Sequence, residues 1–291
     1  MANRKCIDLI PVPSALGAPD KGVAQGPEAL RLAGLEDTLL RCGWRTHWGS
    51  AVAVPTGERW QALRQVCDNL TQRVEKSMAA GHRPLVLGGD HAIATGTWRG
   101  VARHVGSPAQ PFGLIWLDAH LDAHTPEDSL SANPHGMPVA LLLGDGDQGL
   151  AHPWLAPSRI CLVGGRSWEL PEHVRLERFG VHVFDHKYIA SRGIEAVLKE
   201  AIDIASLGTT GFGLSIDLDV FDPSEAPGVN SPAADGASSA AWLPLLKGLA
   251  ARDDCLAVEI VEYDPTRDPL GITSALACHL TKSLYSAKDT D

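Results

Sequence analysis

Short apolar runs recur along the whole chain, and helical periodicities separate most of them. Apolar runs that do not alternate with polar residues are typical of strands covered on both faces of a sheet. Eight such runs are predicted as strands, at residues 7–12, 47–54, 84–87, 112–117, 160–163, 181–184, 212–216 and 256–261.

The clearest helical pattern covers residues 58–80 and ends at Gly81. Further helices are predicted at residues 27–42, 92–105, 193–206, 239–253 and 271–286. Strands that alternate with helices favour an α/β fold with three layers, α/β/α, around a central, mostly parallel eight-stranded sheet. Because no internal repeat or long linker interrupts the pattern, residues 1–291 are expected to form a single domain.

Composition narrows the range of partners. The net charge of -10 disfavours nucleic acid, which needs a basic patch, and suits a cationic small substrate or metal ions. No apolar stretch approaches the roughly 20 residues that cross a bilayer, and the N-terminus lacks the features of a signal peptide. The six cysteines are scattered without a C-x-x-C pair, which is typical of free thiols in a reducing compartment. We therefore expect a cytoplasmic protein without membrane contact.

Clusters of polar side chains follow three of the apolar runs, where ligands gather in parallel sheets. The first cluster is Asp118-Ala-His120-Leu-Asp122. In an extended segment every second side chain projects to the same face, so these three side chains could converge. Carboxylates packed together at a strand end cost several kcal/mol unless cations compensate them, and this favours a metal site over a solvated loop.

The second cluster places Asp217 and Asp219 two residues apart, with Asp222 out of phase and expected to form a turn or to support the others. The third is Gly-Gly-Asp-His at residues 88–91, where the glycines permit a sharp turn from strand to helix and place His91 at the helix start. Alone, this third motif is equally typical of a turn with a helix cap. It gains weight because the two carboxylate clusters need further ligands.

Together the three clusters offer two imidazoles and four carboxylates as metal ligands: His91, Asp118, His120, Asp122, Asp217 and Asp219. Four carboxylates carry a charge that two divalent cations neutralise. A catalytic zinc usually takes three protein ligands and keeps one position open, so six ligands suit two metals better. Oxygen-rich ligation without thiolate favours manganese over zinc or copper, which predicts two Mn²⁺ per chain.

The motifs Gly-Gly-Asp-His, Asp-Ala-His-x-Asp and Ser-x-Asp-x-Asp-x-x-Asp-Pro, in this order, are similar to those of the ureohydrolase family, which includes arginases and agmatinases. The resemblance runs from residues 21–31 to residues 262–265, and residues 133–139 resemble arginases in particular. It implies an α/β sheet covered on both faces, two Mn²⁺ held by the six ligands, and a homotrimer or homohexamer. It also implies hydrolysis of the guanidino group of an arginine-like compound to urea, or a urea derivative, and an amine such as ornithine.

The resemblance implies three catalytic roles. Asp122 would be both a metal ligand and the proton carrier to the leaving nitrogen. His135 would shuttle protons to solvent, because imidazole titrates near the working pH. Glu262 would bind the guanidinium, because a carboxylate can pair with two N–H donors; Glu259, on the opposite face of the same run, is the poorer candidate.

Substrate identity is expected to depend on the loop after the first motif. Arginases have an asparagine at the position of His124 and hydroxyls at those of Ser129 and Ser131, where they hold an α-carboxylate. Asn133 is expected in the same pocket, and Glu169 stands where arginases place an aspartate for the α-amino group. L-Arginine is therefore the first expected substrate, with Nω-hydroxy-arginine or guanidinobutyrate close behind. Agmatine is less favoured, because the hydroxyls suit a carboxylate.

Other classes fit the residues less well. A deacetylase would use one zinc and fewer ligands. A non-catalytic relative is disfavoured because all six ligand positions, His135 and Glu262 are intact. A dinucleotide-binding enzyme would need a G-x-G-x-x-G motif after the first strand. The histidines outside the motifs, His47 and His82 among them, are assigned to structure or surface.

Overall fold

A computed structural model describes residues 6–105, 111–146 and 149–287. All eight predicted strands form, and they build one parallel sheet in the order β2-β1-β3-β8-β7-β4-β5-β6. Their bounds are β1 Cys6–Val12, β2 Arg45–Trp48, β3 Arg83–Gly88, β4 Gly113–Leu117, β5 Ile160–Val163, β6 His182–Phe184, β7 Phe212–Asp217 and β8 Cys255–Val261. The expected fold class is confirmed.

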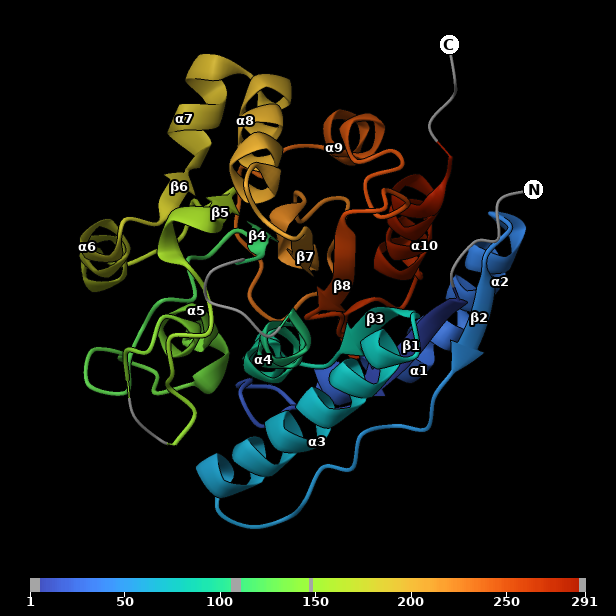
Figure 1. Cartoon of the computed structure of the whole chain (residues 1–291), viewed down its shortest axis with the longest axis horizontal. Helices are drawn as coiled ribbons and strands as arrows, with labels where there is room; N and C mark the ends of the chain where they lie inside the picture. Colours follow the sequence, from blue (N-terminus) through green and yellow to red (C-terminus); the bar gives the residue numbers. More distant parts are fainter. Residues whose placement is uncertain (1–5, 106–110, 147–148, 288–291) are drawn as a thin grey trace.

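Helices cover both faces of this sheet, which gives the three layers (Figure 1). The α-helices are α1 Gly26–Leu32, α2 Leu35–Arg41, α3 Arg59–Ala79, α4 Ala94–Val105, α5 Pro138–Leu142, α6 Leu170–Phe179, α7 His186–Arg192, α8 Ile194–Ser206, α9 Ser239–Leu245 and α10 Ile272–Tyr285. Short 3-10 helices are η1 Gly22–Gln25, η2 His91–Ile93, η3 Pro134–Gly136, η4 Pro157–Arg159, η5 Leu218–Val220 and η6 Pro265–Arg267. Helices α3 to α6 pack on one face, and the other α-helices pack on the opposite face.

The structure differs from the sequence pattern at several boundaries. The strand predicted at 47–54 ends at Trp48, where its pairing with β1 stops. The helix predicted at 27–42 is two helices, because Gly34 adopts a left-handed φ of 86° between them. The helix predicted at 239–253 ends as α9 at Leu245, with Pro244 inside its last turn. Helices α5, α6 and α7 have no counterpart in the predicted set.

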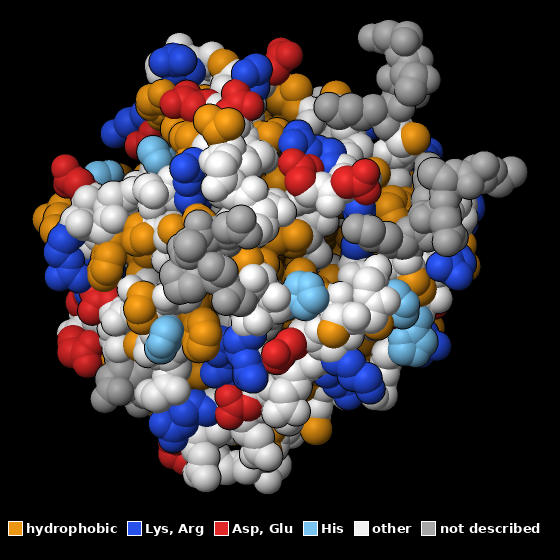
Figure 2. Space-filling view, in the orientation of Figure 1, with side chains coloured by type: hydrophobic (Ala, Val, Ile, Leu, Met, Phe, Trp, Pro, Cys, Tyr) orange, Lys and Arg blue, Asp and Glu red, His pale blue; other side chains and the backbone are white. Residues whose placement is uncertain are grey.

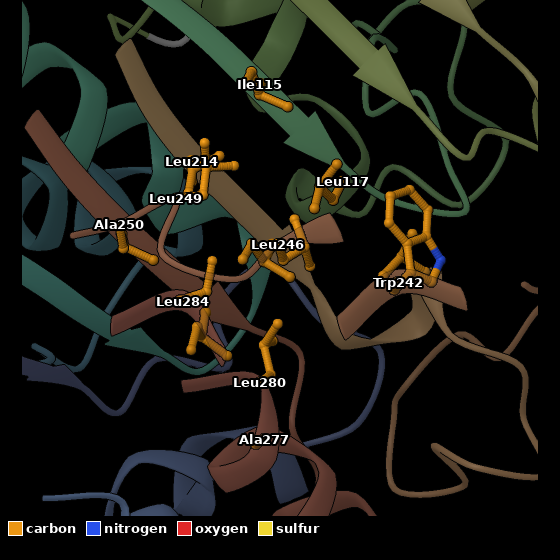
Figure 3. Close-up of a cluster of buried hydrophobic side chains, with 14 of the residues drawn as sticks. Ile115, Leu117, Leu214, Trp242, Leu246, Leu249, Ala250, Ala277, Leu280 and Leu284 are labelled. Carbon is orange, nitrogen blue, oxygen red and sulfur yellow. The ribbon is translucent and has the colours of Figure 1, made fainter. Parts of the chain in front are cut away.

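The core on the side of α9 and α10 is aliphatic and closely packed. Leu246, Leu280 and Leu284 belong to one cluster with Leu214 of β7, and all four side chains are fully buried (Figure 3). Burial of each such side chain contributes about 1.5–3 kcal/mol, so the sheet is a firm support for the loops that follow its strands.

On the face in Figure 2, Lys and Arg side chains are scattered among Asp, Glu and His side chains. No helix within the described ranges combines the length and the apolar character that a membrane span requires.

Candidate metal centre and substrate pocket

Neighbouring strands bring the predicted metal ligands together at the carboxyl edge of the sheet. Strands β3, β8, β7 and β4 are adjacent, so the residues that follow them meet at one edge. His91 opens the 3-10 helix after β3, Asp118 follows β4 directly, and Asp217 is the last residue of β7. Asp219 lies one turn further on, in η5.

The ligand atoms form two groups that share one carboxylate. His91, Asp118 and Asp217 form the first, and Asp118, His120 and Asp219 form the second; within each group the atoms lie within 4.8 Å of one another. Asp118 Oδ2 is 3.2 Å from His91 Nδ1, and Asp118 Oδ1 is 3.5 Å from His120 Nδ1. The two oxygens of Asp118 therefore face different groups, as expected of a carboxylate between two ions.

Asp122 reaches the first group by a turn of the chain. Its Oδ2 lies 3.1 Å from His91 Nδ1. Its φ is 49°, a left-handed conformation that is uncommon for a residue other than glycine. The backbone of the turn is held where Val139 N donates to Asp122 O at 2.9 Å. The extended segment expected after Leu117 was therefore wrong, although Asp122 lies where that expectation placed it.

The first group has the properties of a cation site. Asp118 and His91 are each only 1% exposed. His91 Nδ1 is buried and has no hydrogen-bond partner among the described residues, although three carboxylate oxygens lie within 3.4 Å of it. Burial and the nearby charge of Asp118 raise the pKa of Asp122 to about 7, and burial and the charges of Asp219 and Asp118 raise that of Asp217. The carboxylates thus oppose each other's ionisation, and a bound cation would relieve this.

Hydrogen bonds fix the orientation of His91. Its Nε2 lies 2.9 Å from Ser215 Oγ, and Ser215 Oγ donates to Glu259 Oε1 at 2.8 Å. Because the serine proton is directed to Glu259, His91 Nε2 is the donor and His91 Nδ1 keeps its lone pair for a metal. The His91 ring also stacks on Trp116, whose Nε1 donates to Asp118 Oδ2 at 2.9 Å.

Sequence reasoning did not assign a role to Ser215, Glu259 or Trp116. The sequence contained a signal for Ser215, which lies two residues before Asp217 and therefore shares its face of β7. The partner Glu259 could not be found in the same way, because its contact with Ser215 requires the pairing of β7 with β8.

Glu262 follows β8 and points into the pocket with one oxygen free. Its φ of 65° turns the chain at the strand end, and Oε1 accepts from His91 N at 2.8 Å. Oε2 is buried without a hydrogen-bond partner among the described residues. His135 Nδ1 lies 3.3 Å from Oε1. Burial acts to lower the pKa of His135, but the contact with Glu262 outweighs it and raises that pKa to about 9.

A cavity of about 250 Å³ joins the metal ligands to the surface. All five residues predicted to bind substrate line it: His124, Ser129, Ser131, Asn133 and Glu169. None of the described residues that line it is a lysine or an arginine. The predicted catalytic residues Asp122, His135 and Glu262 line the same cavity.

Carboxylates surround His124 at the outer end of the cavity. Its Nδ1 is 2.9 Å from Asp128 Oδ1, and its Nε2 is 2.8 Å from Glu169 Oε2 and 3.2 Å from Glu172 Oε2. Burial acts to lower the pKa of His124, but Glu172 and Asp128 outweigh it and raise that pKa to about 9. Both ring nitrogens are therefore occupied by protein carboxylates. Glu172 also accepts from Glu169 N at 2.9 Å, at the start of α6.

Comparisons with known proteins agree with the fold and show the family. The sequence profile of the Arginase family matches residues 5–286. An arginase of Brevibacillus brevis is 36% identical over 98% of this chain and 99% of its own length, and an arginase of Bacillus caldovelox is 34% identical over the same shares. The crystal structure of arginase from Bacillus subtilis superposes with a TM-score of 0.91 at 33% identity, over 98% of this chain and 100% of that one.

An all-parallel α/β fold that gathers carboxylates and imidazoles at its carboxyl edge defines the class as a metal-dependent hydrolase. The chain belongs to the Arginase family, and its reaction class is that of the ureohydrolases, hydrolysis of carbon–nitrogen bonds in linear amidines. The predicted resemblance is confirmed.

Proposed function

We propose that this enzyme hydrolyses the guanidino group of an arginine-like compound to urea and an amine, with two Mn²⁺ per chain. The observation that carries the proposal is the position of Glu262. Glu262 has a buried Oε2 without a hydrogen-bond partner among the described residues, and it lines the same cavity as Asp217 of the first ligand group and as His120 and Asp219 of the second.

The ligand groups provide one place for each ion. His91, Asp118, Asp122 and Asp217 would hold the first ion, and Asp118, His120 and Asp219 would hold the second. Oxygen-rich ligation without thiolate supports manganese. Bound in these places, such ions would make hydroxide available at neutral pH by lowering the pKa of water.

The remaining steps belong to side chains of the chain itself. Glu262 Oε2 would accept N–H groups of the guanidinium and orient it towards the ligand groups. Asp122, which lines the cavity beside them, would carry a proton to the leaving nitrogen. His135 would exchange protons with solvent, a role supported by its contact with Glu262 and by its partial exposure.

The outer end of the pocket supports a substrate that carries an ammonium group. His124 has no N–H left for a substrate carboxylate, whereas Glu169 is 54% exposed and can accept from an amine. The hydroxyls of Ser129 and Ser131 lie 3.4 Å apart, and whichever of them accepts in this contact can donate to a carboxylate. L-Arginine, which has both groups, is thus the first substrate. Agmatine should be hydrolysed faster than guanidinobutyrate. This order is the reverse of the one that the loop hydroxyls alone suggest. Nω-hydroxy-arginine stays an alternative substrate.

A panel of guanidino compounds tests this proposal. Manganese-loaded protein should form urea fastest from L-arginine, then from agmatine, and slowest from guanidinobutyrate. The shorter asparagine side chain cannot contact Asp128 and Glu169 at the same time, so it would keep an N–H group free for a substrate carboxylate. His124→Asn should therefore increase the preference for arginine over agmatine by about fivefold to tenfold. No urea from any of the compounds would contradict the reaction, and an unchanged profile in the variant would contradict the role of His124.

Three broader proposals rest on the resemblance and on weaker structural support. We propose one domain for the whole chain, supported by the continuous sheet. A homotrimer or homohexamer is supported by exposed apolar side chains such as Leu32 and Leu270. A cytoplasmic location is supported by the six cysteines, which are all free thiols.

A further inference from the structure

A second cluster of metal-ligating side chains lies at the opposite edge of the sheet. Cys6 and Asp8 are two residues apart in β1 and share one face. Asp8 is paired with His47 of β2. Because Ile7 is paired with Arg83, the residue before β3, His82, lies level with Cys6. Three adjacent strands thus place a thiol, a carboxylate and two imidazoles together.

The Asp8 carboxylate is the centre of this cluster. His82 Nδ1 lies 3.1 Å from each oxygen of Asp8, and His47 Nδ1 lies 3.4 Å from Oδ1. Cys6 Sγ lies within 4.8 Å of the ligand atoms of Asp8 and His82. The side chains remain accessible to an ion from solvent, with 15% of Asp8, 36% of His82 and 70% of His47 exposed.

This cluster is separate from the catalytic site. Strand β3, the six residues Arg83–Gly88, lies between His82 at its start and His91 beyond its end. Six residues of strand span about 20 Å, so the two groups share no ligand. The four residues Cys6, Asp8, His47 and His82, here called the amino-edge cluster, do not line the catalytic cavity.

We propose that Cys6, Asp8 and His82, with His47 as the fourth ligand, bind a divalent transition metal of the zinc type. One sulfur, two nitrogen and one oxygen donor make a four-coordinate set that zinc prefers in tetrahedral sites. The ligands of such a site lie about 3.5 Å apart, because zinc bonds to nitrogen and sulfur are about 2.0 and 2.3 Å long. The separations from Asp8 to His82 and His47, 3.1 to 3.4 Å, are close to this value, and Cys6 Sγ lies within 4.8 Å of Asp8 and His82. The His47 side chain contacts Asp8 but lies outside the group of three, so it would have to rotate to complete the site.

Two features of the surroundings act against binding of a cation. Burial and the charge of Asp8 raise the pKa of the Cys6 thiol, and a bound ion would displace that thiol proton to solvent. Arg73 and Lys76 of α3 line the adjacent cavity of about 430 Å³ and oppose a cation by their charge. The Arg73 guanidinium, however, is directed to Ser50, where its NH2 group donates to Ser50 Oγ at 3.0 Å.

The donor sets of the two sites should select different ions. The catalytic ligands include no thiol and suit manganese, whereas the amino-edge set includes a thiolate and suits softer ions. An ion bound there would join β1, β2 and β3 near their start. Because it would bind the folded chain and not the unfolded one, it would stabilise the fold.

Cobalt is a probe that distinguishes the two sites. Protein is first loaded with Mn²⁺ and then titrated with Co²⁺, and the thiolate-to-cobalt absorption in the near ultraviolet is recorded. We expect one equivalent of Co²⁺ per chain to give this band, and Zn²⁺ to remove it by displacement. Cys6→Ser should abolish the band, and His82→Ala should weaken Co²⁺ binding by about tenfold or more. Cys278→Ser is the matched control, because it removes a partly buried thiol elsewhere and should leave the band unchanged.

Two results would overturn the proposal: no thiolate band in the unmodified protein, or a band that persists in Cys6→Ser. Cys6→Ser changes one atom, and its urea formation should equal that of the unmodified enzyme, which verifies that the variant is folded. The spectroscopic readout does not depend on guanidine hydrolysis, so it fails or succeeds separately from the proposed function.

Discussion

The two ends of strand β3 place metal-ligating side chains in opposite surroundings. At the carboxyl end, His91 and Asp118 are almost fully buried with further carboxylates around them. At the amino end, His82 and Asp8 are partly exposed and contact each other directly. Uncompensated buried carboxylates are costly, whereas exposed imidazole–carboxylate contacts are worth little in either direction.

The contrast indicates that burial, more than residue type, decides whether a cluster of ligand side chains needs a bound ion. We expect the carboxyl-end group to depend on bound ions, because its charges are shielded from solvent and several carboxylates lie close together. We expect the amino-end group to be stable with or without an ion, because its side chains are partly exposed to water. Substitutions at the two ends should therefore differ in their effects on activity and stability.

Asp122→Asn should have the largest effect. The amide keeps the shape of the side chain but removes a charge next to His91 and the proposed proton carrier. General acid–base catalysis contributes about 10²–10⁴-fold to rates, so urea formation should fall by about 10³-fold, and one Mn²⁺ should be held more weakly. Urea assays and metal analysis of the same sample measure both effects. A nearly normal rate would exclude the proton role of Asp122.

Glu262→Gln should impair substrate handling without removing metal. The variant loses the charge that pairs with the guanidinium, and truncation of a buried charge pair costs about 2–5 kcal/mol. We expect kcat/KM to fall by at least about 30-fold while the Mn²⁺ content stays the same. A loss of manganese in parallel with activity would instead identify Glu262 as part of the metal centre.

Glu259→Gln should show an intermediate effect through Ser215 and His91. Loss of the buried carboxylate leaves the Ser215 hydroxyl free to turn, so the His91 ring is held less firmly. Such supporting partners typically change metal affinity by about 10–100-fold. Turnover at limiting Mn²⁺ should therefore fall and recover when Mn²⁺ is in excess. A defect that excess Mn²⁺ does not correct would argue against a positioning role.

Asp8→Asn should have the smallest effect. The partly exposed contacts with His82 and His47 are worth about 0–1 kcal/mol, and the change lies far from the catalytic cavity. In metal-free protein we expect less than about 1 kcal/mol change in the free energy of unfolding, and no change in urea formation. A large loss of stability would show that burial does not explain the contrast between the two ends.

The parts of the molecule that could be predicted from sequence are those set by local patterns. The apolar runs predicted the strands, and the polar residues directly after them predicted His91, Asp118 and Asp217 at one edge. The split at Gly34 was not foreseen, because a glycine in a helical pattern does not reveal its left-handed φ.

What the sequence could not provide depends on contacts between distant segments. The charge state of His124 follows from Asp128 and from Glu172 in α6, a helix that the periodicity did not indicate. The amino-edge cluster requires β1 to lie between β2 and β3, which no local pattern specifies. His47 and His82 therefore looked like isolated surface histidines.

The central claim is that two ions share Asp118 at the carboxyl edge. Anomalous diffraction from crystals of manganese-loaded protein tests it most directly. We expect two manganese positions, one among His91, Asp118 and Asp217 and the other among Asp118, His120 and Asp219. A single ion at full manganese loading, or two ions that do not have Asp118 in common, would contradict it.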